Sequence, residues 1–541
     1  MTGALPHSVD VLVVGSGGAG LSAALRAAQG GLRVLVLEAG PCIGGTTAMS
    51  GAGTWIPASP QARAAGLSDD PARALDYIRA VSPPGWQNTE DPLWHAFTRA
   101  APEMLAFVEA HSDLRFDLAA DADPWPQAPH AMARGRMLSP RPCPARVPGF
   151  RLQPPHVPHV LTYQEMKAQD PWHHPLRTLW RLAPRLLWRG VTGQRGQGTA
   201  LIAGLARAVL AQGGVIRTEC RAKRLLRDAT GGVTGAEIDH DGQTIPVAAR
   251  VGVVLASGGF ERDTTRRARH FAGPVDLIAS SPHNTGDAAR MAEEAGAALA
   301  HMDQANIAPA LPARLRGTDL PIGTFHHREP GAILVGPDGR RFVDEWAFNL
   351  GEVLLRRNAD GSARHLPCWM IADRAVLQET PMLRLFLARA PGWMIRADDA
   401  QTLAARLNLP APALCDTLMR WNSGAVQGHD PDFGRHLDPW HGPDPTRLRP
   451  LRGGLIALPF NLVFLSTKGG PRTDDRARVL RPDGQPIAGL YCAGVAMANP
   501  FGSRAVGSGT TIGPNLTWGW IAGTDLLRRA DDMNHKGPQT P

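Results

Sequence analysis

The sequence is poor in residue types that would mark several other functional classes. Six cysteines are spread over 541 residues, and no two of them form a CxxC pair. This spacing argues against a disulfide framework and against a zinc or iron–sulfur site, so we expect no metal and a reducing compartment. No uncharged apolar stretch reaches the roughly 18 residues that cross a bilayer.

Signals for export and for nucleic-acid binding are also missing. The first ten residues, MTGALPHSVD, have neither the basic start nor the apolar centre of a signal peptide, so we expect a cytoplasmic protein. The net charge is +8, but the basic residues are scattered singly along the chain. Because no reading motif accompanies that charge, we expect no nucleic-acid partner.

What is present is an ordinary globular balance, with 43% hydrophobic and 20% charged residues in a chain long enough for two or three domains. Its start predicts a complete βαβ unit. The apolar run 11–14 is typical of a buried parallel strand, a glycine-rich turn and a helix over 21–29 follow, and a second strand at 33–37 ends at Glu38.

The glycines of the turn each have a physical reason. Gly15 permits a tight turn out of the strand, Gly17 lets the backbone approach a pyrophosphate, and Gly20 allows the helix to pack against the sheet. Glu38 stands where an acid accepts hydrogen bonds from a ribose diol. A glycine turn without a ligand is the less favoured alternative, because strand, glycines, helix, strand and acid all fall in order.

Further glycine-rich segments favour FAD over NAD. The loop 44–51 is placed to run beside a flavin, and the segments 256–260 and 507–514 offer other close backbone approaches. The last of them opens a predicted helix over 515–527 whose amides face the flavin's pyrimidine end. The predicted cofactor contacts are Gly15, Gly17, Gly18, Ala19, Gly20, Glu38, Ala39, Gly45, Thr46, Thr47, Ser50, Gly51, Ala222, Ser257, Gly258, Gly494, Thr511 and Ile512.

Motifs along nearly the whole chain carry a family resemblance. They are VVGSGGAG (13–20), GGTTAMSG (44–51), ASGGFE (256–261), NTGD (284–287), GRRFVDE (339–345), STKGGPRTD (466–474), GLYCAG (489–494) and GSGTTIGP (507–514). With them the sequence resembles the flavoproteins that include 3-ketosteroid Δ1-dehydrogenase and, more distantly, the flavoprotein subunits of fumarate reductase and succinate dehydrogenase. The segment 466–474 is closer to the ketosteroid branch.

The resemblance implies an α/β fold, with a Rossmann-like FAD-binding domain and an inserted α+β substrate-capping domain. We expect the first part of the FAD-binding domain at 1–271, with a helical excursion at about 60–195. The capping domain is expected at 272–445, the second FAD-binding part at 446–530, and a disordered tail at 531–541.

The resemblance also implies an FAD-dependent α,β-dehydrogenation of a cyclic ketone, cyclohexanone-like or 3-ketosteroid-like. A base removes the α proton, the flavin N5 takes hydride, and the backbone N–H of Gly509 polarises the carbonyl. The family's catalytic tyrosines are missing, because the chain has only three tyrosines. At the family's positions stand Ala505 with Val506, Asn349, and Trp125.

Five side chains are candidates for the remaining chemistry. Tyr163 is the candidate base or donor, although a phenol titrates near pH ~10 and needs a nearby cation; a buried core tyrosine is the alternative. Arg504 matches a substrate-binding arginine of fumarate reductases and would clamp a carboxylate, or it is structural. Trp125 lines an apolar cleft or packs a loop. His326 and His327 neighbour a predicted strand, and because adjacent strand residues face opposite ways, at most one would reach a ligand. A structural role is the favoured alternative for both.

Two functional alternatives to the dehydrogenase stay open. One is a fumarate-reductase-like reduction of an activated C=C bond in a carboxylic acid, and the other is a non-catalytic flavin-binding partner protein. In each case we expect FAD to be non-covalent, because the loop 44–51 holds no histidine or cysteine, although Cys42 is near. The dehydrogenase would pass its electrons to an external acceptor.

The segment 176–188 predicts an amphipathic helix with arginines on one side and tryptophans and leucines on another. Such a helix rests on a membrane surface or covers the protein's own core. The second interpretation is favoured because it is the commoner use of the pattern, so membrane association is the less favoured expectation.

Overall fold

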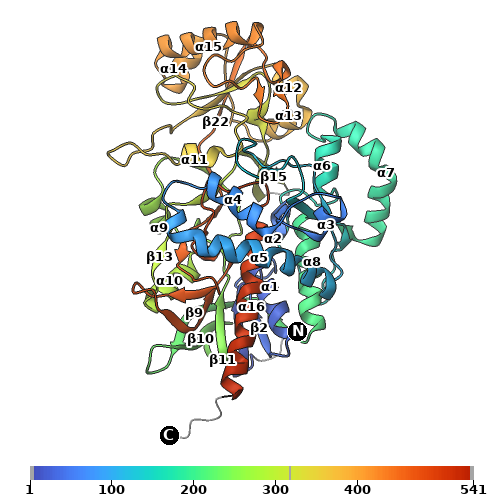
Figure 1. The fold of residues 1–541 in the computed structure, drawn as a ribbon. Coiled ribbons are helices and arrows are strands. Elements are labelled where there is room, and N and C mark those ends of the chain that lie inside the picture. Colours follow the sequence, from blue (N-terminus) through green and yellow to red (C-terminus); the bar gives the residue numbers. More distant parts are fainter. Residues whose placement is uncertain (1–4, 316–317, 536–541) are drawn as a thin grey trace.

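The computed structural model describes residues 5–315 and 318–535 (Figure 1). Its nucleotide-binding part is built on an eight-stranded sheet in the order β25-β26-β11-β1-β2-β8, with β10 and β9 continuing from β11. β8, β2, β1, β11 and β26 are parallel, and the others join antiparallel. The strands are β1 (Ser8–Val14), β2 (Val34–Leu37), β8 (Val215–Arg217), β9 (Cys220–Arg227), β10 (Val233–His240), β11 (Gln243–Leu255), β25 (Arg478–Leu480) and β26 (Pro486–Cys492).

The predicted βαβ unit is confirmed at the start of the chain. β1 is buried beyond its first residue, as its continuous apolar run requires, and α1 (Gly18–Gln29) connects it to β2. The C-terminal helix α16 (Ile512–His535) crosses α1 so closely that a Cβ on Gly519 would lie 2.2 Å from the carbonyl oxygen of Ala19. α8 (Gln197–Ala211) also packs against α1.

The predicted excursion carries helices and several short strands. A buried arginine, Arg136, ties it together by bonding Asp69 (2.7 Å) and Asp123 (2.8 Å), and all three side chains are at most 3% exposed. Its elements, with those just before it, are α2 (Gly45–Met49), β3 (Thr54–Trp55), α3 (Pro60–Ala64), α4 (Pro71–Val81), α5 (Gln87–His111), β4 (Phe116–Leu118), β5 (Met137–Pro140), β6 (Cys143–Pro144), α6 (Tyr163–Gln169), α7 (Pro175–Thr192) and β7 (Gln194–Arg195).

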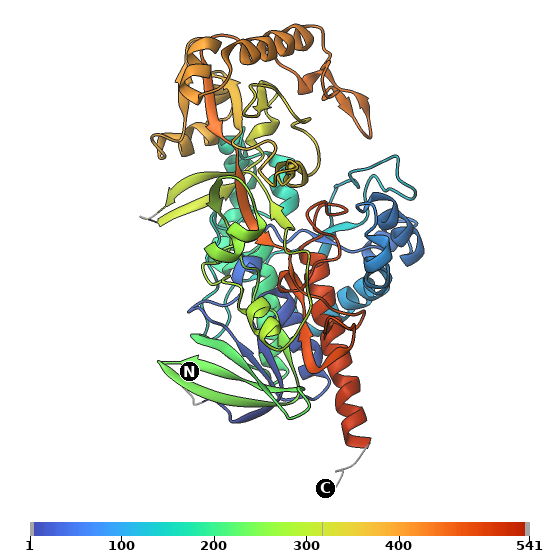
Figure 2. The same cartoon turned by 90° about the vertical axis from the view of Figure 1, so that its left-hand side faces the viewer.

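The inserted segment forms a separate unit with its own cores, at the end of the molecule opposite the C-terminus (Figure 2). Its sheet has the order β17-β18-β22-β19. The elements of this unit are β15 (Ala310–Leu315), β16 (Thr318–Gly323), η1 (His326–Arg328), β17 (Ala332–Val335), α11 (Leu350–Leu354), β18 (Trp369–Asp373), α12 (Val376–Glu379), α13 (Pro381–Ala388), β19 (Ile395–Ala397), α14 (Ala400–Leu407), α15 (Ala411–Val426), β20 (Leu437–Asp438), β21 (Gly442–Pro443), η2 (Pro445–Arg447) and β22 (Leu455–Pro459). We call this unit the cap.

The strand pairing puts the end of the cap later in the sequence than the expected boundary after residue 445. β22 lies beyond it, yet it pairs with β18 and β19 of the cap, because its apolar residues complete that sheet. A three-stranded sheet, β12-β23-β14, connects the cap to the nucleotide-binding part. The connecting elements are α9 (Thr264–His270), β12 (Val275–Ile278), α10 (Asp287–Glu294), β13 (Leu299–Ala300), β14 (Ala305–Ile307), β23 (Leu462–Thr467) and β24 (Gly470–Pro471).

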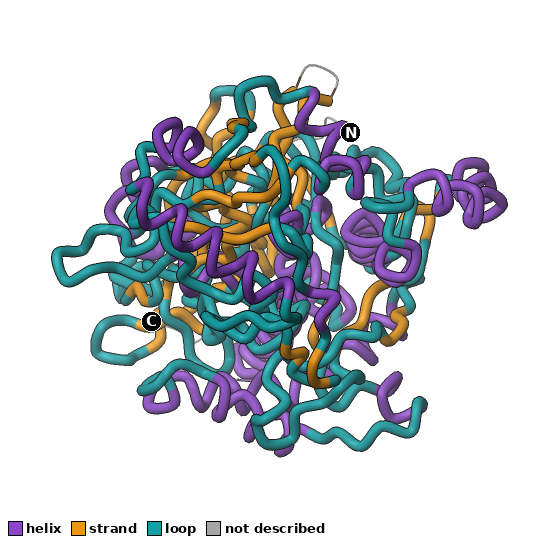
Figure 3. Tube along the Cα trace, turned by 90° about the horizontal axis from the view of Figure 1, so that it is seen from above, coloured by secondary structure: helices purple, strands orange, loops and turns teal. Residues whose placement is uncertain are grey.

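The C-terminal part returns to the first sheet through β26, the turn η3 (Gly494–Ala496) and α16. The predicted tail begins too early, because residues 531–535 continue α16; its remainder, 536–541, lies outside the described residues. Seen from above, the strands gather in the middle and helices surround them (Figure 3). Among the helices of 5–315 and 318–535, none has the length and apolarity to cross a membrane.

Candidate active site

The first glycine-rich turn leaves no room for side chains at two of its glycines. Gly15 has a φ of +113°, and a Cβ there would lie 2.3 Å from the carbonyl oxygen of Ala256. A Cβ on Gly20 would lie 2.0 Å from the carbonyl oxygen of Gly15. Gly17 differs, since the nearest atom to its Cβ would be Thr47 Oγ1 at 3.8 Å. The turn is thus tightly packed against the protein at Gly15 and Gly20 and stays open at Gly17, as a phosphate-binding turn requires.

Glu38 directly follows β2 and connects the turn to the next loop. It is 7% exposed and accepts a hydrogen bond from the hydroxyl of Ser16, whose oxygen accepts one from the Gly44 amide (2.9 Å). The carboxylate therefore holds two glycine-rich segments together besides standing at the ribose position. Of the other predicted contacts here, Ala39 is partly exposed and Ala222 is buried in β9.

The second loop packs its threonines toward neighbouring segments. Thr46 Oγ1 accepts hydrogen bonds from the Ser281 amide (3.0 Å) and from Asn284 Nδ2 (3.1 Å). Thr47 Oγ1 accepts one from the amide of Gly18 (3.2 Å). The Thr47 bond ties this loop to the first turn, and the Thr46 bonds tie it to the segment 281–284. The remaining predicted contacts lie at the ends of α2: Gly45, Ser50 and Gly51.

Two more glycines in the left-handed region follow β11 and β26, strands parallel to β1, and so lie at the same end of the sheet as the first turn. Gly258 has a φ of +83°, and a Cβ there would lie 2.6 Å from Asn284 Oδ1. Gly494 has a φ of +79°, and a Cβ there would lie 2.8 Å from the Cβ of Ala19. Segments 200 to 500 residues apart in the sequence therefore meet at backbone distance here, Gly15 with Ala256 and Gly494 with Ala19, as a dinucleotide-binding site needs.

Buried oxygens around the cradle lack partners within the described part of the chain. Ser257 Oγ and Asn515 Oδ1 are buried and accept or donate no hydrogen bond there. A bound polar ligand would supply the hydrogen-bond partners that these two atoms lack. Thr511 accepts a bond from Asn306 Nδ2 (3.3 Å), and Ile512 begins α16. These residues fit a bound dinucleotide.

The short segment 51–55 leads from the second glycine-rich loop to the C-terminal glycine loop. Gly51 lies against the ring of Tyr163, whose Cδ2 would be 3.7 Å from a Cβ at Gly51. Four residues later, the Trp55 amide donates to the carbonyl of Gly509 (3.2 Å). Gly509 has a φ of +90°, and its own N–H donates no hydrogen bond among the described residues. Two predicted catalytic groups thus lie along one segment.

Tyr163 begins α6 and belongs to a hydrogen-bonded chain. Its hydroxyl donates to Asp121 Oδ1 (3.0 Å), which also accepts from Lys167 Nζ (2.8 Å). Burial and the Asp121 carboxylate raise the pKa of Tyr163, and Arg328 only partly offsets them. The lowered pKa that the sequence hypothesis needs for a tyrosinate base is therefore not found, and the phenol stays protonated beside its carboxylate.

Arg504 and Trp125 lie together between the excursion and the cap. The guanidinium is 5.2 Å from the Trp125 ring centroid, and Arg504 Nη1 is 3.3 Å from Glu352 Oε1 of α11. The ring of Phe348 meets Trp125 edge-on at 5.7 Å. Asn349 donates from Nδ2 to the carbonyl of Arg504 (3.2 Å). The cap therefore closes directly onto the loop before Gly509.

Tyr77 is a site residue that the sequence did not indicate. Its hydroxyl donates to the carbonyl of Val506 (2.9 Å), 429 residues later, and its ring lies near Trp55 (6.4 Å between centroids). Asp123 accepts from Trp55 Nε1 (3.2 Å) and from Arg136, and burial raises its pKa. No local signal predicts these contacts, because every partner is distant in sequence.

His326 and His327 neighbour strands as expected, since the 3₁₀ turn η1 that holds them lies between β16 and β17. Both are buried, at 3% and 2% exposure, which agrees with the favoured structural role. Both pack against Phe460, at 5.8 and 5.1 Å between ring centroids. Burial lowers the pKa of His326 to about 4, so both rings are neutral and belong to the cap's core.

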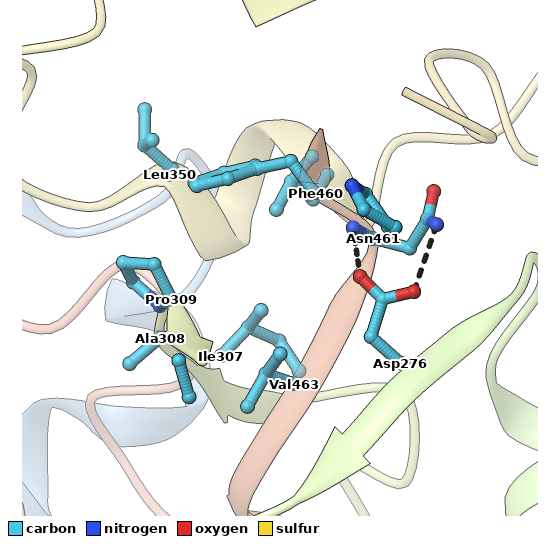
Figure 4. A pocket seen from close by; sticks show the side chains of 11 residues that line it. Asp276, Ile307, Ala308, Pro309, Leu350, Phe460, Asn461 and Val463 are labelled. Carbon is cyan, nitrogen blue, oxygen red and sulfur yellow. Dashed lines mark hydrogen bonds between the residues drawn. The ribbon is translucent and has the colours of Figure 1, made fainter. Parts of the chain in front are cut away.

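A small pocket lies at the junction of cap and connecting sheet (Figure 4). Asp276 there accepts hydrogen bonds from the Asn461 amide (2.6 Å) and side chain (2.9 Å), and its pKa is raised by burial. Leu350 and Phe460 line the apolar side. None of the predicted site residues lines this pocket, so it is a feature of the junction and not of the cradle.

The comparisons with known proteins agree with this geometry. A family model described as FAD binding domain matches residues 10–512. A 3-oxosteroid 1-dehydrogenase of Mycolicibacterium smegmatis is 33% identical over 98% of both chains. The chain belongs to this FAD-binding family. A 4-oxocyclohexanecarboxylate 2-dehydrogenase of Sinomonas cyclohexanicum is 31% identical over 98% of this chain and 95% of its own.

Among solved structures, a 3-ketosteroid Δ1-dehydrogenase from Sterolibacterium denitrificans is similar at a TM-score of 0.85 and 29% identity, covering 97% of this flavoprotein and all of that chain. The predicted cofactor FAD and the predicted FAD-binding fold are thus confirmed. In this flavoprotein the first turn and Glu38 would hold the adenosine diphosphate half. The loop ending at Gly51 and the start of α16 would hold the flavin half.

One histidine of the flavoprotein connects the excursion to the cap. His173 Nδ1 lies 2.7 Å from Asp170 Oδ2, and Nε2 lies 3.1 Å from Glu329 Oε1. The hydrogen bond with Glu329, reinforced by Asp170 and opposed by burial, raises the pKa of His173 to about 9. At neutral pH the imidazolium therefore joins the two parts by a charged bond.

This bond predicts a pH-dependent stability. Because the folded pKa of His173 is above the usual 6.5, its contribution is complete below about pH 6.5 and is lost as pH rises toward 9. We expect His173→Gln to lower the melting temperature at pH 6 by about 1–2 °C and to have no effect above pH 10. The measurement is thermal unfolding from pH 6 to 10, with the exposed pair of His441 and Asp438 as control (His441→Gln). Equal pH profiles for wild type and His173→Gln would contradict it.

Proposed function

We propose that this flavoprotein is an FAD-dependent dehydrogenase that introduces a C=C bond next to the carbonyl of a cyclic ketone. FAD, when bound, accepts the hydride from the β carbon. The observation that carries the proposal is the segment 51–55, which contacts Tyr163 at Gly51 and Gly509 at Trp55 and follows directly on the loop proposed to hold the flavin. Near-full-length similarity to a 3-oxosteroid 1-dehydrogenase and a 4-oxocyclohexanecarboxylate 2-dehydrogenase supports it.

The backbone N–H of Gly509 is the donor for the ketone oxygen. It is uncommitted within the described residues, and a positive φ holds it in a fixed direction. A Cβ there would lie 2.6 Å from the Trp55 amide nitrogen, so only glycine fits. A fixed donor stabilises the negative charge that develops on the carbonyl oxygen when the α proton leaves.

The pair of Tyr163 and Asp121 is the proton acceptor. As the α C–H bond breaks, its electron pair stays with the substrate and the proton moves to the Tyr163 oxygen. The phenolic proton moves at the same time along the 3.0 Å hydrogen bond to Asp121. The phenol never has to exist as a free tyrosinate, so its raised pKa is compatible with catalysis. Lys167, half-exposed, connects Asp121 to solvent.

Arg504 and Trp125 form a second wall of the proposed substrate site, at the contact with the cap. The aromatic ring suits an alicyclic substrate, and the guanidinium suits a carboxylate or a second carbonyl at its far end. The ion pair with Glu352 leaves part of the guanidinium for that contact, because Arg504 Nε has no partner among the described residues. The substrate is therefore cyclohexanone-like or 3-ketosteroid-like, with a polar group remote from the reacting carbonyl.

Replacing this arginine separates the two functional candidates. We expect Arg504→Ala to raise KM for 4-oxocyclohexanecarboxylate about 10- to 100-fold, while kcat for an uncharged ketosteroid changes less than about threefold. Arg420→Ala, which breaks an exposed pair with Asp432, is the matched control. If Arg504→Ala instead abolishes reduction of fumarate by a wild type that reduces it readily, the fumarate-reductase-like alternative replaces the dehydrogenase.

We also propose that FAD is bound without a covalent bond, in a cytoplasmic protein. All six cysteines are free, which supports a reducing compartment, and the nearest one to the flavin loop, Cys42, is only partly buried. Acid precipitation should release all flavin into the supernatant. A yellow precipitate that becomes colourless in Cys42→Ser would identify a covalent thioether instead.

A product assay tests the proposed function. Wild type is incubated with cyclohexanones, 3-ketosteroids and dicarboxylates, together with an artificial electron acceptor, because the natural acceptor is external. An enone with two hydrogens fewer than its ketone is the expected product. If none of the ketones leads to reduction of the acceptor, the proposed dehydrogenase is wrong. Reduction of enoates by the same enzyme would then favour the reductase, and no reaction with enoates would favour a non-catalytic flavin-binding partner.

A further inference from the structure

The helix α7 has an uncovered apolar face. Six of its large hydrophobic side chains are 58% to 85% exposed, out of fourteen such side chains in the described residues. The favoured interpretation, a helix that covers the protein's own core, is therefore wrong for this face. Figure 1 shows α7 along one outer side of the molecule. We call this set the outer face of α7: Leu176, Leu179, Trp180, Leu187, Trp188 and Val191.

The opposite side of the helix is fixed to the protein. Arg189 is 8% exposed and forms a two-pronged pair with Glu165, at 2.6 and 2.9 Å. Leu182 is buried, and Thr178 donates to the carbonyl of Gln169 (3.1 Å). With about 3.6 residues per turn, these anchors lie on one side of the helix. The outer face is therefore held outward by specific bonds and is not a loosely placed segment.

The charges of α7 are all of one sign. Its sequence, PLRTLWRLAPRLLWRGVT, contains four arginines and no acid. Arg189 and in part Arg185 are paired with Glu165, whereas no ion pair within the described residues engages Arg177 or Arg181. Exposed Arg177 and Arg181 therefore flank an apolar face that contains two tryptophans. Tryptophan rings beside apolar and basic side chains are typical of helices that lie in a membrane interface.

We propose that the outer face of α7 docks this protein onto an anionic lipid bilayer, with the helix lying in the plane of the interface. The charge pattern favours lipid over a second copy of the chain. Two copies paired face to face would bring arginines together without an acid on either helix, whereas anionic headgroups neutralise them. The inference goes beyond the proposed function and does not depend on it, since docking requires only α7 and its anchors.

A vesicle flotation experiment tests the apolar part of the surface. The full-length holoprotein is mixed with phosphatidylcholine vesicles containing about one third phosphatidylglycerol. We expect wild type to float with them, and Trp180→Ser with Leu187→Ser to weaken binding at least about tenfold. Met419→Ser with Val426→Ser, which removes two exposed hydrophobic side chains from α15, is the control and should float like wild type. Flavin absorbance and the melting temperature confirm that each variant is folded.

A second double variant tests the contribution of the arginines to binding. Arg177→Gln with Arg181→Gln should weaken binding to the anionic vesicles about tenfold, and wild-type binding should fall as salt rises. Binding of the same variant to pure phosphatidylcholine should stay as weak as that of wild type. Wild type that does not float at low salt would overturn the proposal. So would a wild-type dimer, seen by light scattering, that becomes a monomer in Trp180→Ser with Leu187→Ser.

Discussion

Tyr163→Phe is expected to lower kcat for ketone dehydrogenation by about 10²- to 10⁴-fold, with little change in KM. The change removes the oxygen that accepts the α proton and leaves the ring that packs against Gly51. Asp121→Asn should cost a comparable factor, because an amide cannot take the phenolic proton across the 3.0 Å bond. Steady-state kinetics with one ketone and an artificial acceptor measure both.

The chain offers a closely matched control for this prediction. Tyr491 is also buried and also donates to a carboxylate, Asp525, at 3.0 Å. It stands in β26, in the sheet and outside the substrate wall. Tyr491→Phe should therefore leave kcat unchanged and lower only the stability. A Tyr163→Phe variant as active as Tyr491→Phe would remove Tyr163 from the mechanism and leave Tyr77, beside Val506, as the next candidate.

The second large effect is expected at the dinucleotide turn. Gly15→Ala should lower FAD affinity at least about 100-fold, so that the purified protein is colourless. A Cβ at residue 15 would lie 2.3 Å from the carbonyl oxygen of Ala256, at a φ of +113° that alanine rarely adopts. The turn must move, and the amides that face the pyrophosphate move with it. Titration of apoprotein with FAD, followed by flavin fluorescence, measures the affinity.

Gly31 provides the control, since it too has a positive φ (+87°) but a Cβ there would meet no atom within 4 Å. Gly31→Ala shares the backbone strain without the clash, so it should bind FAD like wild type. Circular dichroism distinguishes loss of the site from loss of the fold. If a folded Gly15→Ala variant binds FAD normally, the cofactor does not depend on this turn.

The nucleotide-binding part could be predicted from the sequence because its signals are local. The strand, the glycines and the helix of the first turn are consecutive, and each glycine has a steric reason that appears in the structure at Gly15 and Gly20. The same holds for the left-handed glycines Gly258 and Gly494. Motifs of this kind also carried the resemblance to the family, which the comparisons confirm.

The substrate side could not be predicted to the same depth, because its contacts join distant segments. Tyr77 bonds Val506 across 429 residues, and no pattern near Tyr77 indicates that partner. The sequence likewise did not reveal that Asp121 accepts from Tyr163 and raises its pKa. The end of the cap was placed too early because β22 looks like any other apolar strand until its partner β18 is known.

The amphipathic pattern of α7 shows a further limit of prediction from the sequence. The spacing of its leucines and tryptophans predicts an apolar face but not which way that face points. Only the buried anchors, Leu182 and the pair of Arg189 with Glu165, show that it points away from the protein. Helical periodicity therefore identifies the apolar face of a helix, and the packing of the helix decides whether that face covers the core or points outward.

We propose above all that the bound flavin of this protein takes a hydride from the carbon β to a ring ketone. The most direct measurement is the visible spectrum of the purified protein under anaerobic conditions, before and after addition of a 3-ketosteroid or 4-oxocyclohexanecarboxylate. We predict a flavin absorbance band near 450 nm that disappears when the ketone is added and returns when an electron acceptor follows. A band that persists through every ketone, or a protein that stays colourless when FAD is supplied, would contradict the account.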